Sequence, residues 1–428
     1  MTSFSSNSAF RTVQLKDDCF AFGGGLVPLA EAHAELGRRL EPLTLPVDVP
    51  VGSSSGRTLA EDIASDRDVP PHANTAVDGY AFRFSDLAEK GEGWLNLIGS
   101  AGAGHPWAGD LPDGSTVRVL TGAVLPSDTD TVVMEEDAEL RGQRVYVPAG
   151  LRQGANARSA GEDLQVGATV LRAGQRIGPA ETGILAALGR TSVKVRSRLR
   201  IGVLSTGDEL ADPGRALETG QIYDSNRAML CALVRATGAD VSDLGIVADR
   251  AEDVQQEFAQ AASFHDLLIV SGGMSESEED HVRRTLNDAG SLYFWRLAVK
   301  PGRPVGLGQF AETPVVGLPG NPVAAFVMFL VIARPVIARL AGENWKFPSG
   351  VPAECGFTYK KKTGRREFLR VRRRSAEHPE VLELFPRSGA GILSSVAWAD
   401  GLAVLLENVS EVRPGQPVSW LPFHGLLD

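Results

Sequence analysis

Three short apolar runs, each followed by a glycine turn with polar side chains, dominate the hydrophobic pattern of the chain. The runs span residues 201–204, 267–270 and 315–316, and the turns span residues 205–209, 271–273 and 317–322. Buried parallel strands read as continuous apolar runs, and ligands of open α/β sheets bind beyond the carboxyl ends of such strands. We therefore expect the three turns to meet in one crevice, the leading candidate for chemistry.

Strand-like and helix-like segments alternate around these runs, from residue 199 to residue 346. This alternation predicts a parallel sheet with crossover helices. Asp224 or Ser225 is suited to cap one helix, which Gly238 ends. Residues 241–247 predict another strand, and apolar positions from 254 to 262 predict a second amphipathic helix.

The longest apolar run, residues 323–333, follows Asn321 and Pro322. A capping residue before a proline at the first helical position predicts a helix start, and we expect Pro335 to kink or end this helix. The run is shorter than the roughly 20 residues needed to cross a bilayer, so we expect no membrane association.

The rest of the chain predicts a leader and three further domains. Residues 1–25 read as a flexible leader, and residues 26–65 with 168–198 as a helical linker domain. Residues 66–167 predict a β-rich domain and residues 347–428 a small C-terminal β domain, because short strand-like runs alternate there with Gly and Pro.

Within the linker domain, residues 27–40 have apolar positions at helical spacing, and residues 184–188 lie in a second helical segment. These two helices are expected to pack against each other. In the β-rich domain, strands are expected at residues 116–120, 131–134 and 144–147.

The composition narrows the class of protein. A net charge of -10 over 428 residues disfavours a nucleic-acid partner, which needs a basic face. Cys19, Cys231 and Cys355 show neither disulfide nor zinc spacing. The N-terminus lacks the apolar core of a secretory signal, so we expect a cytoplasmic protein.

Carboxylates are frequent at the predicted crevice. Asp208 and Glu209 follow the first run, Asp249 follows the strand at 241–247, and Asp280 follows the Gly-Gly turn. Hard oxygen ligands on loops suit Mg²⁺, which binds one or two carboxylates while holding phosphates. Helix caps or surface charges are the alternative interpretation.

Cations and backbone donors accompany these acids. Lys300 and Arg303 flank a Pro-Gly turn, and the turn at Gly272 and Gly273 can present N–H groups to an anion. Together with a metal they favour a phosphate-containing ligand, although both cations can equally be surface charges. The basic residues from 360 to 374 are either a solvated face or an anion site.

Eight segments in order resemble the MoeA family of molybdopterin molybdenumtransferases, which includes the E domains of gephyrin and plant Cnx1. The likeness runs from about residue 26 to the C-terminus. The segments are residues 74–81, 121–123, 161–163, 205–210, 223–227, 271–273, 300–304 and 317–322.

The resemblance implies an elongated homodimer of four domains. The α/β domain is similar to the MogA and MoaB molybdopterin-binding fold, and a helical linker domain joins it to the β-rich domain. The C-terminal domain is a β barrel. The family's active site lies between the α/β domain of one subunit and the β-rich domain of the other.

The implied reaction takes adenylylated molybdopterin, molybdate and a divalent cation, Mg²⁺, and yields molybdenum cofactor and AMP. An adenylyltransferase partner and apo-molybdoenzymes that accept the cofactor are further implied partners. The resemblance assigns catalytic roles to Asp78, Glu209, Asp249 and Asp280, the last three also to the metal. Substrate-binding roles are assigned to Thr121, Arg158, Asp163, Ser205, Asp208, Ser271, Gly272, Gly273, Arg296, Lys300, Arg303, Asn321, Arg370 and Ser394.

The chain departs from the family pattern in one loop, residues 272–280. A usual glycine is Ser277 here, and Glu276 adds a negative charge that repels a pyrophosphate unless a cation lies between. Arg296 also replaces a frequent lysine. Two alternatives stay open: a molybdopterin adenylyltransferase, which shares the α/β fold, and a scaffold that binds or delivers cofactor without catalysis.

Overall fold

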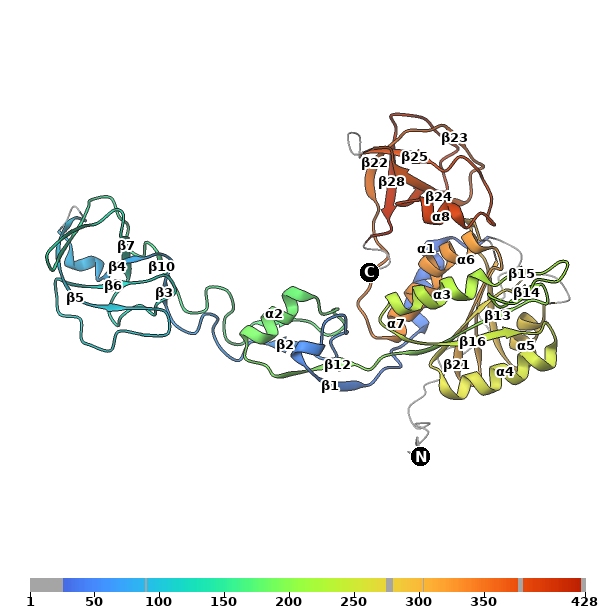
Figure 1. Ribbon diagram of the computed structural model, residues 1–428, viewed down its shortest axis with the longest axis horizontal. Coiled ribbons are helices and arrows are strands. Elements are labelled where there is room, and N and C mark those ends of the chain that lie inside the picture. Colours follow the sequence, from blue (N-terminus) through green and yellow to red (C-terminus); the bar gives the residue numbers. More distant parts are fainter. Residues whose placement is uncertain (1–25, 89–90, 275–279, 303, 376–379, 425–428) are drawn as a thin grey trace.

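The computed structural model describes residues 26–88, 91–274, 280–302, 304–375 and 380–424. The predicted leader, residues 1–25, lies outside the described residues. The chain is elongated, with a β-rich domain at one end and a small linker domain in the middle (Figure 1). An α/β domain with a β barrel beside it forms the other end. The expected multidomain α/β fold is confirmed.

The α/β domain is built on a six-stranded sheet in the order β16-β13-β17-β21-β20-β18. The first four strands are parallel, as expected, whereas β20 runs antiparallel to both of its neighbours. The sheet strands are β13 (Arg200–Thr206), β16 (Asp240–Val247), β17 (Leu267–Ser271), β18 (Gly290–Arg296), β20 (Pro304–Phe310) and β21 (Thr313–Leu318). The other elements are α3 (Ser225–Ala236), α4 (Ala251–Phe264), α5 (His281–Ala289) and the short strands β14 (Leu210–Ala211) and β15 (Ile222–Tyr223).

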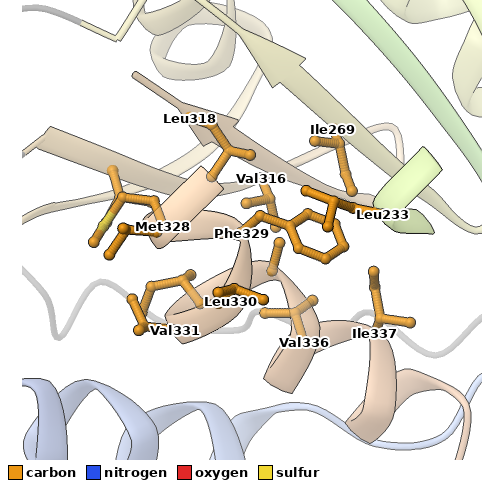
Figure 2. Close-up of a cluster of buried hydrophobic side chains, with 14 of the residues drawn as sticks. Leu233, Ile269, Val316, Leu318, Met328, Phe329, Leu330, Val331, Val336 and Ile337 are labelled. Carbon is orange, nitrogen blue, oxygen red and sulfur yellow. The ribbon is translucent and has the colours of Figure 1, made fainter. Parts of the chain in front are cut away.

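One apolar helical segment runs through the core of this domain. It comprises α6 (Pro322–Met328), a π-helical turn (Phe329–Ala333) and α7 (Arg334–Leu340). Figure 2 shows its side chains, among them Phe329 and Leu330, packed with Val316 of β21 and Ile269 of β17. The segment Pro322–Leu340 is long and apolar enough to cross a membrane, but 89% of its most apolar window is buried inside the protein. This burial identifies the segment as a core helix of the α/β domain.

Pro335 does not end this helix, contrary to the expectation. A proline has no N–H for the carbonyl four residues earlier, which here belongs to Val331. That carbonyl is instead 2.6 Å from Nε2 of His33. The widened π turn and the contact from His33 let the helix continue to Leu340.

Helix α1 (Leu29–Arg39) forms where it was expected but packs elsewhere. Its apolar face, including Leu29 and Leu36, belongs to the core of the α/β domain and contacts α7. Helix α2 (Pro179–Ala187) packs in a separate core with Val51 and Val195. The predicted packing of the two helices against each other is therefore wrong. Helical periodicity identifies an apolar face but not the surface that covers it.

The linker domain contains two antiparallel strand pairs and α2. Its strands are β1 (Pro46–Pro50), β2 (Ile63–Ala64), β11 (Thr169–Leu171) and β12 (Ser192–Arg196). The chain crosses between linker and α/β domain twice, before β1 and after β12, so two covalent connections join the domains.

The β-rich domain contains a six-stranded sheet in the order β7-β4-β6-β5-β9-β8. The strands expected at residues 116–120, 131–134 and 144–147 are observed. The sheet strands are β4 (Gly79–Phe82), β5 (Gly93–Ala101), β6 (Ser115–Val119), β7 (Thr131–Met134), β8 (Glu139–Arg141) and β9 (Arg144–Val147). A separate pair is formed by β3 (Asn74–Thr75) and β10 (Ala157–Arg158).

The C-terminal domain is a closed barrel, as the resemblance implied, because β24 pairs with β26 as well as with β25. Its strands are β22 (Val351–Cys355), β24 (Arg366–Arg373), β25 (Val381–Leu384), β26 (Gly401–Leu405) and β28 (Pro417–Pro422). Smaller elements are β23 (Tyr359–Lys360), α8 (Ser394–Trp398) and β27 (Glu411–Val412). Strand β19 (Val299–Lys300) of the α/β domain pairs with β24 and so joins the two domains.

Candidate active site

The three glycine turns lie at neighbouring strand ends, as the apolar runs predicted. Ser205 of β13 is level with Ser271 of β17, which is level with Leu318 of β21. Gly272 has a φ of 93°, and a Cβ there would lie 2.6 Å from the carbonyl oxygen of Thr206. Only glycine lets the second turn pass this close to the first strand.

Asn226, at the start of α3, ties these turns together. Its Nδ2 donates to Ser271 Oγ at 2.9 Å and to the Gly320 carbonyl at 2.7 Å. The residue is only 7% exposed, so both bonds are made in a shielded environment. Sequence reasoning placed Asn226 within a family motif but gave it no site role, because helix capping by Asp224 explained the segment.

Several buried oxygens at the crevice have no hydrogen-bond partner among the described residues. They are Ser205 Oγ, Thr206 Oγ1 and Asn226 Oδ1. Buried polar groups are nearly always paired, and unpaired ones are exceptions that need a reason. A polar ligand at the strand ends would supply such partners.

The predicted carboxylates gather beyond β13 and β16. The backbone N–H of Asp249 donates to Oδ1 of Asp208 at 3.1 Å, and Oδ1 of Asp249 is buried without a partner. Burial raises the pKa of Asp249, His281 opposes this, and the negative charges of Asp208, Asp280 and Glu209 raise it further. These acids are therefore electrostatic neighbours.

Asp280 has a structural role as well. It is the N-cap of α5, where its Oδ1 accepts from the backbone N–H of Arg283 at 3.2 Å. Both interpretations of this acid, helix cap and site residue, are therefore compatible with its position.

The donor set suits a divalent cation without being preformed for it. Across the described ranges, no group of three or more His, Cys, Asp and Glu side chains is spaced to hold a metal ion. Mutual repulsion and the orphaned oxygen of Asp249 nevertheless favour a cation among these acids. Glu276 and Ser277 of the divergent loop lie outside the described residues.

Lys300 lines a second part of the site, a cavity of about 430 Å³ between the α/β domain and the barrel. Its Nζ lies 3.2 Å from Oε2 of Glu367 and 3.3 Å from the hydroxyl of Tyr359, which itself donates to Glu367 at 2.7 Å. Burial lowers the pKa of Lys300, but these hydrogen bonds outweigh it and raise the pKa overall. Sequence reasoning missed Tyr359 and Glu367, which come from the barrel.

Arg370 lines the same cavity and is 8% exposed. Burial lowers the pKa of this guanidinium, which still stays charged because an arginine is protonated throughout the physiological pH range. Its Nε donates to Ser395 Oγ at 3.0 Å, whereas the predicted Ser394 is exposed on α8. The substrate-binding role predicted for Ser394 stays a prediction, and the turn of α8 points its neighbour Ser395 toward Arg370.

The cavity adjoins the third strand end. Ala390 lines it, and the Ala390 carbonyl accepts from the backbone N–H of Val323, two residues after Asn321. The Asn321 side chain makes no capping hydrogen bond to α6, so capping does not occupy it. Arg303 lies outside the described residues, and Arg296 ends β18, where its carbonyl accepts from the N–H of Val27 at 2.8 Å.

The polar loops of the β-rich domain form a second set of candidate residues. Asp78 Oδ1 accepts two hydrogen bonds of 2.7 Å from Thr121, one from its N–H and one from its hydroxyl. These bonds lower the pKa of Asp78 and keep it ionised. Strand β3 links Thr121 to Arg158, because Asn74 pairs with Arg158 and Thr75 accepts from the N–H of Gly122.

Asp163 is exposed in the loop that closes the same domain, and its N–H bonds the Val69 carbonyl. Within one chain this set does not meet the strand-end set, because the linker domain separates the two (Figure 1). The predicted residues are thus brought together in two groups rather than one.

Comparison with known proteins decides the family. The family models for the MoeA N-terminal region, a probable molybdopterin binding domain and the MoeA C-terminal region match residues 27–189, 202–339 and 352–423. The molybdopterin molybdenumtransferase of Haemophilus influenzae is 36% identical over 408 residues, which cover 94% of this chain and 100% of that protein. The chain belongs to the MoeA family.

Other relatives of this MoeA-family chain agree. Molybdopterin molybdenumtransferase 1 of Mycobacterium tuberculosis is 31% identical over 89% of the chain and 96% of its own length. The molybdopterin biosynthesis moeA protein of Pyrococcus horikoshii OT3 has a TM-score of 0.79 at 27% identity, covering 92% of this chain and 99% of that one. The family resemblance is confirmed, and the chain is a transferase of molybdenum cofactor biosynthesis.

Proposed function

We propose that this MoeA-family enzyme inserts molybdate into adenylylated molybdopterin and releases AMP in a reaction that needs Mg²⁺. One observation carries the proposal: acids beyond β13 and β16 and a cationic cavity near the end of β21 lie along the same edge of one sheet, and the hydrogen bond from Val323 to Ala390 joins the cavity to the third turn. Phosphoanhydride opening beside a tetrahedral oxyanion calls for both parts.

Each part has a chemical role. Asp249 and Glu209 would hold the cation, and a divalent cation there would supply positive charge to offset that of the pyrophosphate. Lys300 and Arg370 bind the molybdate oxygens, and the fixed guanidinium fork of arginine suits such an oxyanion. Asn226 keeps the second and third turns in register beneath the molybdopterin.

The proposal includes a homodimer, with the β-rich domain of one subunit completing the site of the other. Three features support it. The chain is elongated, and the linker domain separates the β-rich domain, which carries Asp78 and Thr121, from the strand ends of its own chain (Figure 1). Exposed apolar side chains also flank both groups. Leu120 is 41% exposed beside Thr121, and Ile222 is 57% exposed on β15 beside the first turn.

The decisive assay measures AMP. The full-length protein is mixed with adenylylated molybdopterin and Mg²⁺, with or without molybdate, and AMP is followed by chromatography. AMP is expected only when molybdate is present, and chelation by EDTA should stop its release until Mg²⁺ is restored. Absence of AMP under all conditions would refute the proposed reaction.

The same preparation tests the two alternatives. An adenylyltransferase would convert molybdopterin and ATP into the adenylylated form. A scaffold would bind the adenylylated form without releasing AMP, and Glu276→Gln combined with Ser277→Gly would then restore release. We place the reaction in the cytoplasm, between an adenylyltransferase that supplies the substrate and apo-molybdoenzymes that receive the product.

A further inference from the structure

Four arginines surround a small cavity between the linker domain and the α/β domain. They are Arg57, Arg176 and Arg196 of the linker domain and Arg198 of the segment that joins the two domains. Gly238, just after α3, lines the cavity from the α/β side. Gly238 precedes the start of β16, whereas the acid Asp249 follows its end, so the cavity lies at the opposite end of this strand and has no part in the proposed reaction.

These arginines lack carboxylate partners. Within the described ranges, no Asp or Glu forms an ion pair with any of the four, and Arg176 has no side-chain hydrogen bond. The side-chain hydrogen bonds of the other three go to backbone carbonyls: Arg57 to Arg196 at 2.8 Å, Arg196 to Thr44 at 2.9 Å and Arg198 to Gly238 at 2.7 Å. A guanidinium has five N–H donors, so most stay unused.

The surroundings compensate only part of this charge. Helices α3 and α7 both end at the cavity, and a helix C-terminus carries roughly half a negative charge. Asp240 favours the charged form of Arg57, whereas burial and Arg198 disfavour it. Glu343 also lines the cavity, but it is paired with Arg334 at 3.1 Å.

One buried donor is left without a partner. Arg196 Nε has no hydrogen bond to any described residue. A buried and unpaired donor on a charged group costs more than a neutral one, so a ligand that accepts a hydrogen bond would offset this cost. The ligand must be negatively charged, because the surrounding positive charge repels a cation.

We propose that this cavity binds a tetrahedral dianion of the phosphate class and so fastens the linker domain to the α/β domain. The cavity volume of about 30 Å³ fits an inorganic oxyanion or a terminal phosphate group and excludes an organic body. Arginine forks bind such oxygens in pairs, and here three of them lie in the linker domain while the fourth, Arg198, donates to the Gly238 carbonyl of the α/β domain. The bound anion thereby sets the direction of the arm that carries the β-rich domain.

Calorimetric titration of the full-length protein with inorganic phosphate, at constant ionic strength, tests the site. Loss of one charge-assisted partner weakens binding about tenfold or more, which we expect for Arg176→Gln and for Arg57→Gln. Arg172→Gln, at an exposed arginine of the same domain outside the cavity, should leave the affinity unchanged. Equal affinity in Arg176→Gln, or an equal loss in Arg172→Gln, would overturn the proposal.

Further titrations distinguish binding at this cavity from binding at the proposed molybdate site. Arg370→Gln should bind phosphate as the parent does, and loss of phosphate binding in that variant alone would overturn the assignment. Sulfate, molybdate and AMP, titrated in competition, identify which tetrahedral group the cavity prefers. Circular dichroism and melting of each variant without phosphate show that the fold is intact.

The proposed fastening of the linker domain to the α/β domain is tested by a separate measurement. Small-angle X-ray scattering with saturating phosphate should show a narrower range of molecular dimensions for the parent protein and no change for Arg176→Gln. Binding without any change in the parent's scattering would refute the fastening role. None of these measurements depends on AMP release, so failure of the proposed reaction and failure of this proposal are distinguishable.

Discussion

At the residue scale, the backbone of Gly272 determines how closely two strand ends approach. The positive φ and the 2.6 Å gap to the Thr206 carbonyl leave no room for a Cβ. A side chain there would push the second turn away from the first and misalign Ser271. The geometry of the crevice thus depends on the absence of a Cβ atom at Gly272.

Gly272→Ala should therefore destabilise the protein by about 1–3 kcal/mol and greatly reduce AMP release. Gly183 of α2 is the matched control, since a Cβ there meets nothing within 4 Å and the residue lies on the exposed side of its helix. Gly183→Ala should stabilise by about 0.5–1 kcal/mol and leave activity unchanged. Thermal or denaturant unfolding with an AMP assay checks both, and equal effects of the two variants would contradict the crowding argument.

At the cationic cavity, substitutions of Lys300 and of the buried carboxylate Glu367 should change the affinity for molybdate in opposite directions. Lys300→Gln removes a charge that binds oxyanions and should raise the Kd for molybdate about tenfold. Glu367→Gln keeps the shape but removes the negative charge that Lys300 faces, so it should lower that Kd. Calorimetry measures both, with exposed Lys362→Gln as the neutral control. A higher Kd for molybdate in both variants would show that Glu367 helps binding by positioning Lys300 rather than opposing it through its charge.

At the element scale, the helical segment Pro322–Leu340 contains a proline whose lost hydrogen bond is replaced by a contact from another helix. Pro335 leaves the Val331 carbonyl without a helical donor, and His33 of α1 approaches it at 2.6 Å. The same contact holds α1 against the α/β domain. An interruption that the local sequence predicts is thus compensated by a residue 298 positions away.

His33 should make stability fall with acid. Burial lowers its pKa, Arg366 adds to this, and the bond to Val331 opposes it, so the folded state binds the proton less well than the unfolded state. Stability is then complete above about pH 6.5 and is lost as pH falls below that value. His33→Gln keeps a donor for Val331 but does not titrate, so melting curves from about pH 7 to 5 should diverge, with the parent losing more. Parallel curves would contradict this account.

At the scale of the whole molecule, the elongated shape decides where catalysis can occur. The linker domain holds the β-rich domain away from the strand ends of its own chain (Figure 1). Residues that resemble one functional set therefore lie in two groups within one chain. A second subunit is the simplest way to unite them, and C2 dimers are the commonest assembly.

Mixing two inactive variants tests the shared site. Asp78→Asn damages the β-rich group and Asp249→Asn damages the strand-end group, so each homodimer should be inactive. Unfolding and refolding an equal mixture makes half the dimers mixed, each with one intact site, and should restore about a quarter of the parent activity. Light scattering confirms the dimer mass. No restored activity in a mixture with proven mixed dimers would show that each site lies within one chain.

The sequence by itself determined the features that depend on neighbours in the chain. Continuous apolar runs with glycine ends located three adjacent strand ends, and helical spacing located α1, α3 and α4, because these patterns follow from backbone geometry. The ordered motifs identified the family.

Only the tertiary structure decided what distant segments do to one another. It placed α1 in the α/β core and brought His33 to the carbonyl that Pro335 leaves without a helical donor. It also paired Arg370 with Ser395 rather than Ser394, and Lys300 with Glu367. It also gathered four arginines from separate segments around one cavity. Local patterns specify which face of an element is apolar or charged, whereas packing of the whole chain determines what that face meets.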